Sequence, residues 1–471
     1  MSHAYVLSFA RGVTVDRSSA DRIVIQTPIT KRECTFRTPS PGLRQVIDVL
    51  SSTGATEDEL TRLAEELDGT KAVARFSHYL FTFAERQILN YGISCRDRRV
   101  ATLAPASIYF RFLPAPLAPE STYTLSRFAY LHRQQEDLIL ESPLAHGTIT
   151  LHGWDGAALV AELARAQTLG SLCGLLPSMA RDCVALLLEM LLGASFVSEL
   201  NPNEPYAGES EALAQWDFHD LLFHARSRLG RHANPYGETY RFRDEINPLP
   251  AVKEFCTEET IDLYRPDISS LKRGDVPFTL VLEGRRSIRE YGERPITDLQ
   301  LGEFLYRSAR VKELLKTEFH DLSRRPYPGG GAIYELDLYV SVRWCENIGP
   351  GLYHYCPNKH RLEKICGPTE AVDALIKDAA WSAGLAETSQ ILITIAARFQ
   401  RLSWKYESIA YSLLLKNVGV LYQTMYLVAT AMGLAPCGIG GGDSDLFALA
   451  AGLDYYAETS VGEFLLGSKR I

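Results

Sequence analysis

The sequence predicts an α+β protein in which a sheet domain at the carboxyl end follows two tandem winged-helix-like modules. The first observation is a strand–strand–helix pattern that occurs twice before residue 200, which internal duplication would explain. The second is an alternation of helices and strands from Val276 onward. The expected regions are module 1 at 1–98, module 2 at 99–200, an extended linker at 201–274 and the sheet domain at 275–471.

Each copy of the duplicated pattern begins with a short alternating strand that a proline ends. A second strand and an amphipathic helix follow. The matched segments are strands at 21–28 and 136–143, second strands near Thr35 and Thr150, and helices at 42–50 and 156–164. Further helices are expected at 56–67, 72–89 and 180–197, and the last of these is the most apolar. Short helices combined with strands favour a winged-helix fold.

Composition and charge argue against several classes of protein. The chain has 471 residues, with 57 acidic and 49 basic side chains and a net charge of -8, which disfavours binding to a phosphate backbone. We therefore expect no nucleic-acid partner. The opening MSHAYVLSFARG lacks the basic and apolar regions of a secretion signal, so we expect a cytoplasmic protein. The apolar stretch Val418–Pro436 is interrupted by Gln423, Thr424 and Thr430, which favours a helix buried on both sides over a membrane span.

No metal site is expected. The nine cysteines form no C-x-x-C pair and are interpreted as reduced thiols. His219, His224 and His232 lie in the linker, but their spacing does not align them on one face of a helix, and no carboxylate pattern completes a ligand set.

The sheet domain has recognisable strands and one clear helix start. Thr297 is expected as an N-cap with Gln300 at the third helical position. The candidate strands are Glu335–Trp344, a hairpin over Gly351–Ile365 around a Pro-Asn turn, Ser389–Phe399 and Val461–Lys469.

Three clusters in this domain have the composition of ligand-binding elements. RRSIREY (285–291) offers guanidinium groups and a hydroxyl for a phosphate. The glycines of PGGGAIYELDLYV (328–340) let the backbone approach a flat ligand. GIGGG (438–442) comes directly after the long apolar helix, so it is not a dinucleotide-binding fingerprint. Taken singly, each cluster has a plainer explanation: a solvated basic turn, a flexible turn, and a helix C-cap with a loose loop.

In this order the clusters resemble the flavin-binding domain of the nitroreductase superfamily, specifically its azoline dehydrogenase branch, over Val276–Ile471. The family opens with an R-R-S-x-R element and continues with a P-x-G-G-A-x-Y-P-like element, and Glu335 stands where the branch usually has proline. The resemblance implies FMN bound between two copies of the chain. It assigns the phosphate to Arg285, Arg286, Ser287, Arg289, Lys469 and Arg470, the ring system to Gly440 and Gly441, and a contact with the partner's flavin to Gly330 and Gly331.

One dipeptide indicates which members of the azoline dehydrogenase branch this chain resembles most. Lys405-Tyr406 matches a Lys-Tyr pair of peptide azoline oxidases to which proton handling is ascribed. Converting a thiazoline to a thiazole sends a hydride to flavin N5 and a ring proton to a base. We expect a helix N-terminus near Glu407, together with Arg401, to favour deprotonation of the pair. The plainer interpretation is a surface lysine and a packing tyrosine.

Over its whole length the chain resembles a cyanobactin-pathway oxidase, whose front modules are similar to domains that clamp the leader of a precursor peptide by adding a strand. This implies an FMN-dependent oxidase of thiazoline or oxazoline rings, with a heterocyclised precursor peptide as substrate and a cyclodehydratase as partner. The front modules serve as scaffolding in the alternative interpretation.

Other functions stay open at this point. They are an NAD(P)H-dependent nitro or quinone reductase, a flavin-fold module that docks peptide without catalysis, and a winged-helix transcription factor whose basic residues are diluted by acidic ones.

Overall fold

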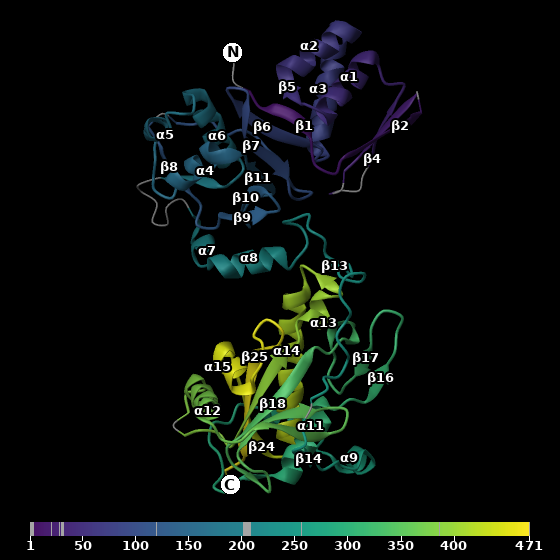
Figure 1. Cartoon of the computed structure of the whole chain (residues 1–471), viewed down its shortest axis with the longest axis vertical. Helices are drawn as coiled ribbons and strands as arrows, with labels where there is room; N and C mark the ends of the chain where they lie inside the picture. The colour runs from purple at the N-terminus through teal and green to yellow at the C-terminus, as the bar shows by residue number, and fades with distance from the viewer. Residues whose placement is uncertain are drawn as a thin grey trace. The chain divides into compact units, whose positions relative to one another are not determined.

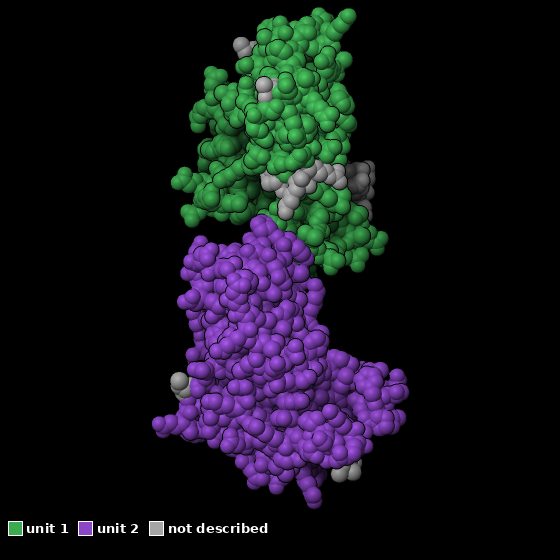
Figure 2. All heavy atoms as spheres, turned by 90° about the vertical axis from the view of Figure 1, so that its right-hand side faces the viewer, with its two compact units in different colours: residues 1–234 green, residues 235–471 purple. Residues whose placement is uncertain are grey.

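The computed structural model describes residues 4–19, 21–27, 29, 33–118, 120–200, 209–255, 257–385 and 387–470. The chain forms two compact units, at 1–234 and 235–471 (Figures 1 and 2). Each unit combines helices with sheets around hydrophobic clusters of its own. The predicted α+β class is confirmed.

The first unit begins with a helical bundle beside a three-stranded sheet. Its elements are β1 (Val6–Phe9), β2 (Thr14–Ser19), β3 (Arg22–Gln26), β4 (Glu33–Arg37), α1 (Pro41–Ser51), β5 (Ala55–Thr56), α2 (Glu57–Asp68), α3 (Ala72–Glu85) and β6 (Leu89–Cys95). The expected helix 72–89 stops at Glu85, because Gln87 has a φ of 55°, which an α-helix does not continue. Leu89 instead pairs with Phe9 in the sheet.

The rest of the first unit extends the same sheet. Its elements are β7 (Arg98–Pro105), β8 (Thr122–Leu125), β9 (Tyr130–Gln134), β10 (Asp137–Glu141), β11 (Gly147–Leu151), α4 (Gly153–Glu162), α5 (Leu169–Leu175), α6 (Arg181–Gly193), β12 (Val197–Leu200), α7 (Glu211–Ala214) and α8 (Phe218–Arg226). The strand order is β5-β1-β6-β7-β11-β10-β9. Strand β7 pairs with β6 and with β11, so one sheet runs through both expected modules.

The expected linker does not form a single segment. Residues 201–208 lie outside the described residues. Helices α7 and α8 belong to the first unit, where Arg127 pairs with Glu209 at 2.9 Å and donates to the carbonyls of Leu213 and Trp216. Residues from Pro235 onward belong to the second unit.

The second unit is built on a seven-stranded antiparallel sheet with the order β14-β21-β20-β18-β22-β25-β24. Its elements are β13 (Gly237–Glu238), β14 (Thr260–Asp262), α9 (Ile268–Gly274), α10 (Phe278–Gly284), β15 (Ile296–Thr297), α11 (Asp298–Ala309), β16 (Glu313–Leu315), β17 (Leu322–Arg324), η1 (Gly330–Ala332), β18 (Leu336–Val342), β19 (Cys345–Glu346), β20 (Gly351–Cys356), β21 (Arg361–Cys366), α12 (Glu370–Ser382), β22 (Ile391–Ala397), α13 (Gln400–Ser403), β23 (Tyr406–Glu407), α14 (Ala410–Ala431), β24 (Leu434–Ile439), α15 (Ser444–Ala451) and β25 (Thr459–Ser468).

Helices cover both faces of this sheet. One core cluster joins the sheet to α11 and α14, and another joins it to α12 and α15 (Figure 1). Burial on both faces explains why β18 and β22 are continuous runs of buried residues. The capping box predicted at Thr297 and Gln300 starts α11.

The long apolar segment differs from its prediction in two ways. Helix α14 ends at Ala431 and buries one stripe of side chains, so it is not buried on both sides within this chain. The chain then turns at Gly433, with a φ of 68°, and Leu434–Ile439 forms edge strand β24. Gly438 therefore lies within β24 and Gly440–Gly442 lead from this strand to α15, so the expectation that the cluster directly follows a helix is wrong. Within the described part of the chain, no helix has the length and apolar character needed to cross a membrane.

Candidate functional site

The arginine element and the basic carboxyl end lie side by side in the second unit. The amide of Ile288 donates to the carbonyl of Pro436 at 2.8 Å, and the amide of Gly292 donates to the carbonyl of Ser468 at 3.0 Å. Tyr291 forms an isolated bridge with Lys469. We call Arg285, Arg286, Ser287, Arg289, Lys469 and Arg470 the basic cluster. Backbone pairing with β24 and β25 thus brings together the residues that the sequence assigned to one phosphate.

Tyr426 of α14 contacts two residues of the basic cluster, Ser287 and Arg285. Its hydroxyl lies 2.7 Å from Ser287 Oγ and accepts a hydrogen bond from the Gly438 amide at 2.7 Å. The guanidinium of Arg285 lies over the same ring, 5.4 Å from its centroid. Sequence reasoning missed Tyr426, although a hydroxyl-bearing ring in an apolar helix was an available signal.

The charges of the basic cluster are largely free to meet an anion. Arg286, Arg289, Lys469 and Arg470 are exposed. Arg289 Nε donates to the Ala383 carbonyl at 2.9 Å, and Arg470 lies 3.7 Å from Glu290 in an exposed pair, which contributes little. Among the described residues, no carboxylate forms an ion pair with Arg285, Arg286 or Lys469. A cluster of cations and one hydroxyl has the donor chemistry that a phosphate needs.

The glycine loop 440–441 borders open space. A Cβ added to Gly440 or Gly441 would meet no atom within 4 Å. Both glycines follow β24, whose other half contacts the basic cluster through Pro436. The loop and the basic cluster are therefore connected by one short edge strand.

Lys405 and Tyr406 contact the other glycine loop. A Cβ on Gly331 would clash with the Tyr406 hydroxyl and lie 3.3 Å from Lys405 Nζ. Gly331 also has a φ of 61°, so only glycine fits here without strain. The structure thus brings Gly331 to Lys405-Tyr406 of the same chain, whereas its predicted contact with a partner's flavin stays a prediction.

The same loop is anchored to α14 by Asn417. Its side-chain Oδ1 accepts from the Gly330 amide at 3.1 Å, and its Nδ2 donates to Glu335 Oε1 at 2.9 Å. Glu335 is fully buried, and burial raises the pKa of its carboxyl group. The residue that departs from the family pattern therefore orients Asn417. Asn417 was also missed, although a lone amide in an apolar helix could have indicated it.

The electrostatics of Lys405 and Tyr406 are opposite to the expectation. Lys405 Nζ lies 3.2 Å from Glu238 Oε1. Burial acts to lower the pKa of Lys405, but Glu238 and the neighbouring tyrosines outweigh it, and the pKa is raised. Burial raises the pKa of Tyr406 as well.

The reason for this difference lies in the neighbours of the pair. Helix α14 begins only at Ala410, and Arg401 directs its guanidinium to the carbonyls of Ile333 and Asp321. The expected helix N-terminus thus lies farther along the chain, and the charge of Arg401 is directed at backbone carbonyls. The charged group beside Lys405 is instead the carboxylate of Glu238, which favours the protonated lysine.

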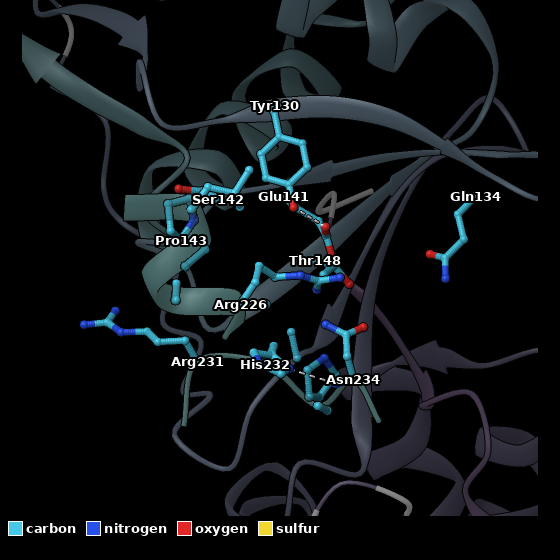
Figure 3. A pocket seen from close by; sticks show the side chains of 17 residues that line it. Tyr130, Gln134, Glu141, Ser142, Pro143, Thr148, Arg226, Arg231, His232 and Asn234 are labelled. Carbon is cyan, nitrogen blue, oxygen red and sulfur yellow. Dashed lines mark hydrogen bonds between the residues drawn. The ribbon is translucent and has the colours of Figure 1, made fainter. Parts of the chain in front are cut away.

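A polar pocket in the first unit is separate from these residues. Helix α8 and the following segment face β9 and β10, and Tyr130, Glu141, Arg226 and His232 line the space (Figure 3). Glu141 accepts from the Tyr130 hydroxyl at 2.5 Å. All residues predicted for the flavin site belong to the second unit, so none lines this pocket.

The described part of the chain has neither a metal-ligand cluster nor a disulfide. It contains no group of three or more His, Cys, Asp and Glu side chains arranged to hold a metal ion. The described cysteines are free thiols, and Cys256 lies outside the described residues.

Comparison with known families matches three regions. The nitroreductase family model matches residues 282–467, the cyanobactin oxidase ThcOx model matches 123–233, and the ThcOx helix-turn-helix domain matches 1–113. The last match agrees with the predicted winged-helix-like front.

Two known proteins and one solved structure are similar to parts of this chain. A protein of Methanocaldococcus jannaschii named as a nitroreductase is 30% identical over 182 residues, which cover 39% of this chain and 85% of that protein. The microcin B17-processing protein McbC of Escherichia coli is 30% identical over 118 residues, covering 24% of this chain but only 42% of McbC. A crystal structure of a nitroreductase-type protein from Ralstonia eutropha has a TM-score of 0.37 and 20% identity, covering 50% of this chain and 99% of that one.

The M. jannaschii relative is covered over more than two thirds of its length, and the flanking matches are in the order that the sequence predicted. The resemblance inferred from the motifs is confirmed: the chain belongs to the nitroreductase family and carries the ThcOx cyanobactin oxidase regions in front of its oxidoreductase domain.

Proposed function

We propose that this chain is an FMN-dependent azoline oxidase that dehydrogenates thiazoline rings, with oxazolines as a second substrate class, in ribosomally made peptides. The observation that carries the proposal is the contact of Lys405 and Tyr406 with Gly331 inside a nitroreductase-family domain. Reduction of a nitro or quinone group by a flavin needs no positioned base, whereas aromatisation of an azoline must remove a ring proton. A buried lysine beside a partly buried tyrosine could handle that proton and so favours the oxidase.

The basic cluster fits the phosphate of FMN. Arg285, Arg286 and Ser287 would hold it together with Arg289, Lys469 and Arg470, because guanidinium groups bind phosphate through paired hydrogen bonds. Gly440 and Gly441 would lie beside the ring system, where their lack of side chains leaves room. When bound, FMN supplies the acceptor for the hydride that leaves the azoline ring.

The chain's own residues would hold the substrate and move the proton. Lys405 is buried and Tyr406 is partly buried, so both are largely shielded from bulk water. Shielding matters because a proton-transfer group works best when a fixed geometry, and not solvent, determines its partners. Gly331 has no side chain, and this lets the backbone of the glycine loop approach Lys405 and Tyr406 closely.

A second copy of the chain would complete the site. Helix α10 comes directly before the basic cluster and exposes Phe278, Leu280 and Leu282, with exposed fractions of 66%, 63% and 42%. Val276, two residues before the helix, is also exposed, at 43%. An apolar group of this kind usually marks an interface. We therefore propose a homodimer whose interface includes α10 and lies beside the proposed FMN phosphate.

The front unit offers a place for the precursor peptide. A groove lies between edge strand β4 and helix α3, and it is lined by Phe36, Arg37, Arg75, Tyr79 and Arg86. Among the described residues, β4 pairs only with β3. A peptide could add to the open edge as a strand, and the arginines favour an acidic one. A cyclodehydratase would supply the heterocycles.

A mass spectrum tests the proposed function. The purified full-length protein, loaded with FMN, is incubated with a peptide that contains thiazolines, and we expect a loss of about 2 Da per ring, the mass of one hydride and one proton. A peptide with unmodified cysteines is the control. An unchanged mass, together with rapid flavin bleaching by NADPH, would favour the reductase, and protein that stays colourless with added FMN would favour the docking module.

A further inference from the structure

We propose that Glu238 is the third member of the proton-handling site, a positioning carboxylate that keeps Lys405 as a cation and takes the proton that Tyr406 passes on. This inference rests on the proposed oxidase function and deepens it, because it makes Tyr406 the group that receives the ring proton. Glu238 lies between the ThcOx match, which ends at 233, and the nitroreductase match, which begins at 282, so neither family model includes it.

The carboxylate of Glu238 contacts both members of the pair. Its Oε1 lies 3.2 Å from Lys405 Nζ and accepts from the Tyr406 hydroxyl at 3.3 Å. Its Oε2 accepts from the Tyr240 hydroxyl at 3.5 Å. One carboxylate therefore determines the orientation of the lysine and the hydroxyl proton of the tyrosine.

Backbone pairing places Glu238 there. We call residues 235–253 the strap. Its strand β13 pairs with β23, with Gly237 opposite Glu407 and Glu238 opposite Tyr406. The amide of Thr239 donates to the carbonyl of Lys405 at 3.0 Å. Side chains directly opposite each other in an antiparallel pair are neighbours, so this register places Glu238 beside Tyr406.

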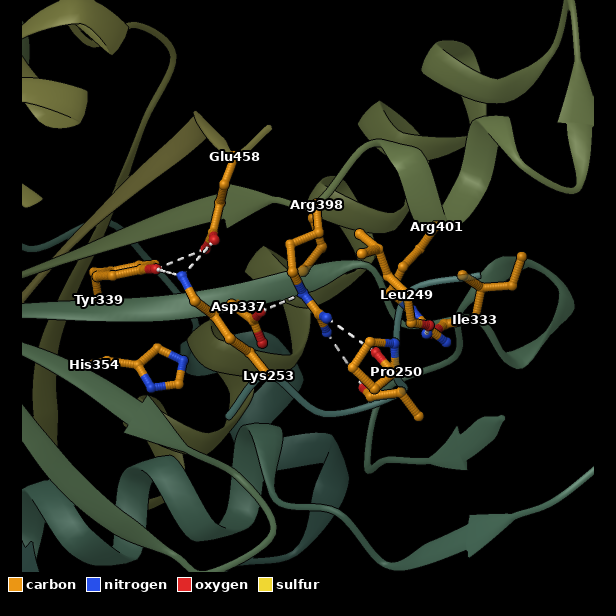
Figure 4. A network of polar contacts seen from close by, with 12 residues as sticks. Leu249, Pro250, Lys253, Ile333, Asp337, Tyr339, His354, Arg398, Arg401 and Glu458 are labelled. Carbon is orange, nitrogen blue, oxygen red and sulfur yellow. Dashed lines mark hydrogen bonds and ion pairs between the residues drawn. The ribbon is translucent and has the colours of Figure 1, made fainter. Parts of the chain in front are cut away.

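Side chains just before Lys405 hold the rest of the strap. Arg398 donates to the Pro250 carbonyl at 2.9 Å and pairs with Asp337 at 2.7 Å, and Arg401 donates to the Leu249 carbonyl (Figure 4). Trp404 Nε1 donates to the Ile246 carbonyl at 2.6 Å. The loop that carries the Lys-Tyr pair thus also binds the segment that carries Glu238.

The arrangement defines a balanced proton path. Tyr406 Oη receives the ring proton as its own proton moves to Glu238, and Lys405 stays an ammonium that stabilises the developing phenolate. The net change within the protein is one proton gained by the carboxylate, and the hydride goes to the flavin of the proposed function. The other charged or titratable groups facing the cluster are Tyr240 of the strap, His320 from the loop before β17, Arg401, and the Arg241–Glu407 pair.

Acetylation of Lys405 tests the contact without requiring catalysis. The full-length protein is treated briefly with acetic anhydride near neutral pH, and modification of Lys405 is measured by peptide mass mapping relative to exposed Lys416 of α14. We expect Glu238→Gln to raise the relative modification of Lys405 about tenfold, because loss of an adjacent carboxylate increases the fraction of free amine. Glu238→Asp should restore much of the protection, and Glu245→Gln, on the exposed part of the strap, should change nothing.

A double-variant cycle tests the proton path. With FMN bound, Glu238→Gln and Tyr406→Phe should each slow thiazoline oxidation about 100-fold or more, and the double variant should be no slower than either, because both changes break one path. Unchanged acetylation of Lys405 together with an undiminished rate in Glu238→Gln would overturn the inference while the oxidase stands. If the wild type leaves the peptide mass unchanged but Lys405 acetylation responds as expected, the oxidase function fails and the contact is upheld.

Discussion

The basic cluster and the Lys405 site are two groups of charged residues on one domain, and they are built in opposite ways. The cluster exposes most of its cations, and its support comes mainly from backbone pairing and Tyr426. Lys405 is buried and has its counter-charge, Glu238, from the same chain. Exposed cations stay hydrated, so leaving them without a counter-ion costs little folding free energy. A buried charge loses its hydration and must be paired within the fold. In our proposal an FMN phosphate would complete the first group, whereas Glu238 of the same chain already pairs with Lys405 in the second.

The largest expected effect comes from removing the cation of the buried site. Lys405→Ala should abolish the loss of about 2 Da per thiazoline while the protein keeps its bound yellow flavin, since the proposed phosphate contacts lie elsewhere. The measurement pairs a peptide mass spectrum with a visible absorption spectrum. Full activity in this variant would show that the proton path does not need Lys405.

Of the variants considered, removing the ion pair between Arg398 and Asp337, which helps to hold the strap, should lower the free energy of unfolding most. Asp337→Ala leaves Arg398 buried without its counter-charge, and this should lower the free energy of unfolding by about 3–5 kcal/mol. Urea unfolding measures the effect, with Asp244→Ala on the exposed strap as the control. A loss below 1 kcal/mol would mean that the strap does not depend on this pair.

Glu463 of β25 sharpens the comparison because it is a buried acid beside the glycine loop. Burial and nearby Asp378 raise its pKa to about 7 from 4.5. The stability that its raised pKa contributes is fully present below pH 4.5 and is lost as pH rises through 7, so wild type should lose up to about 3 kcal/mol over this window relative to Glu463→Gln. Unfolding free energies of both proteins at pH 5 and pH 8 measure this difference. A difference that does not change with pH would contradict it.

The smallest expected effect concerns a single cation of the open cluster. Arg286→Ala should weaken FMN binding by about 1.5–3 kcal/mol, the range for a hydrogen bond to a charged group, so that the flavin separates from the protein on gel filtration. Folding should be unaffected, because Arg286 is exposed. Arg273→Ala on α9 is the matched control, and tight retention of FMN by Arg286→Ala would locate the phosphate contact elsewhere.

Local patterns were enough to predict much of the fold and to select candidate site residues. Strands β18, β22 and β25 were predicted as strands and β20 as part of a hairpin around a Pro-Asn turn, and the start of α11 was predicted from a capping box. The motif order identified the arginine element and the Lys-Tyr pair. Such signals are carried by neighbouring residues, so the sequence alone contains them.

The tertiary structure decided which distant groups meet. Strand β24 looked like a continuation of the preceding apolar helix, and only its pairing with β25 makes it a strand. Glu238 lies on a two-residue strand with no local signal, yet its carboxylate reverses the expected charge preference of Lys405. The protonation preference of a buried group depends on its neighbours in space, and these are specified by the fold as a whole.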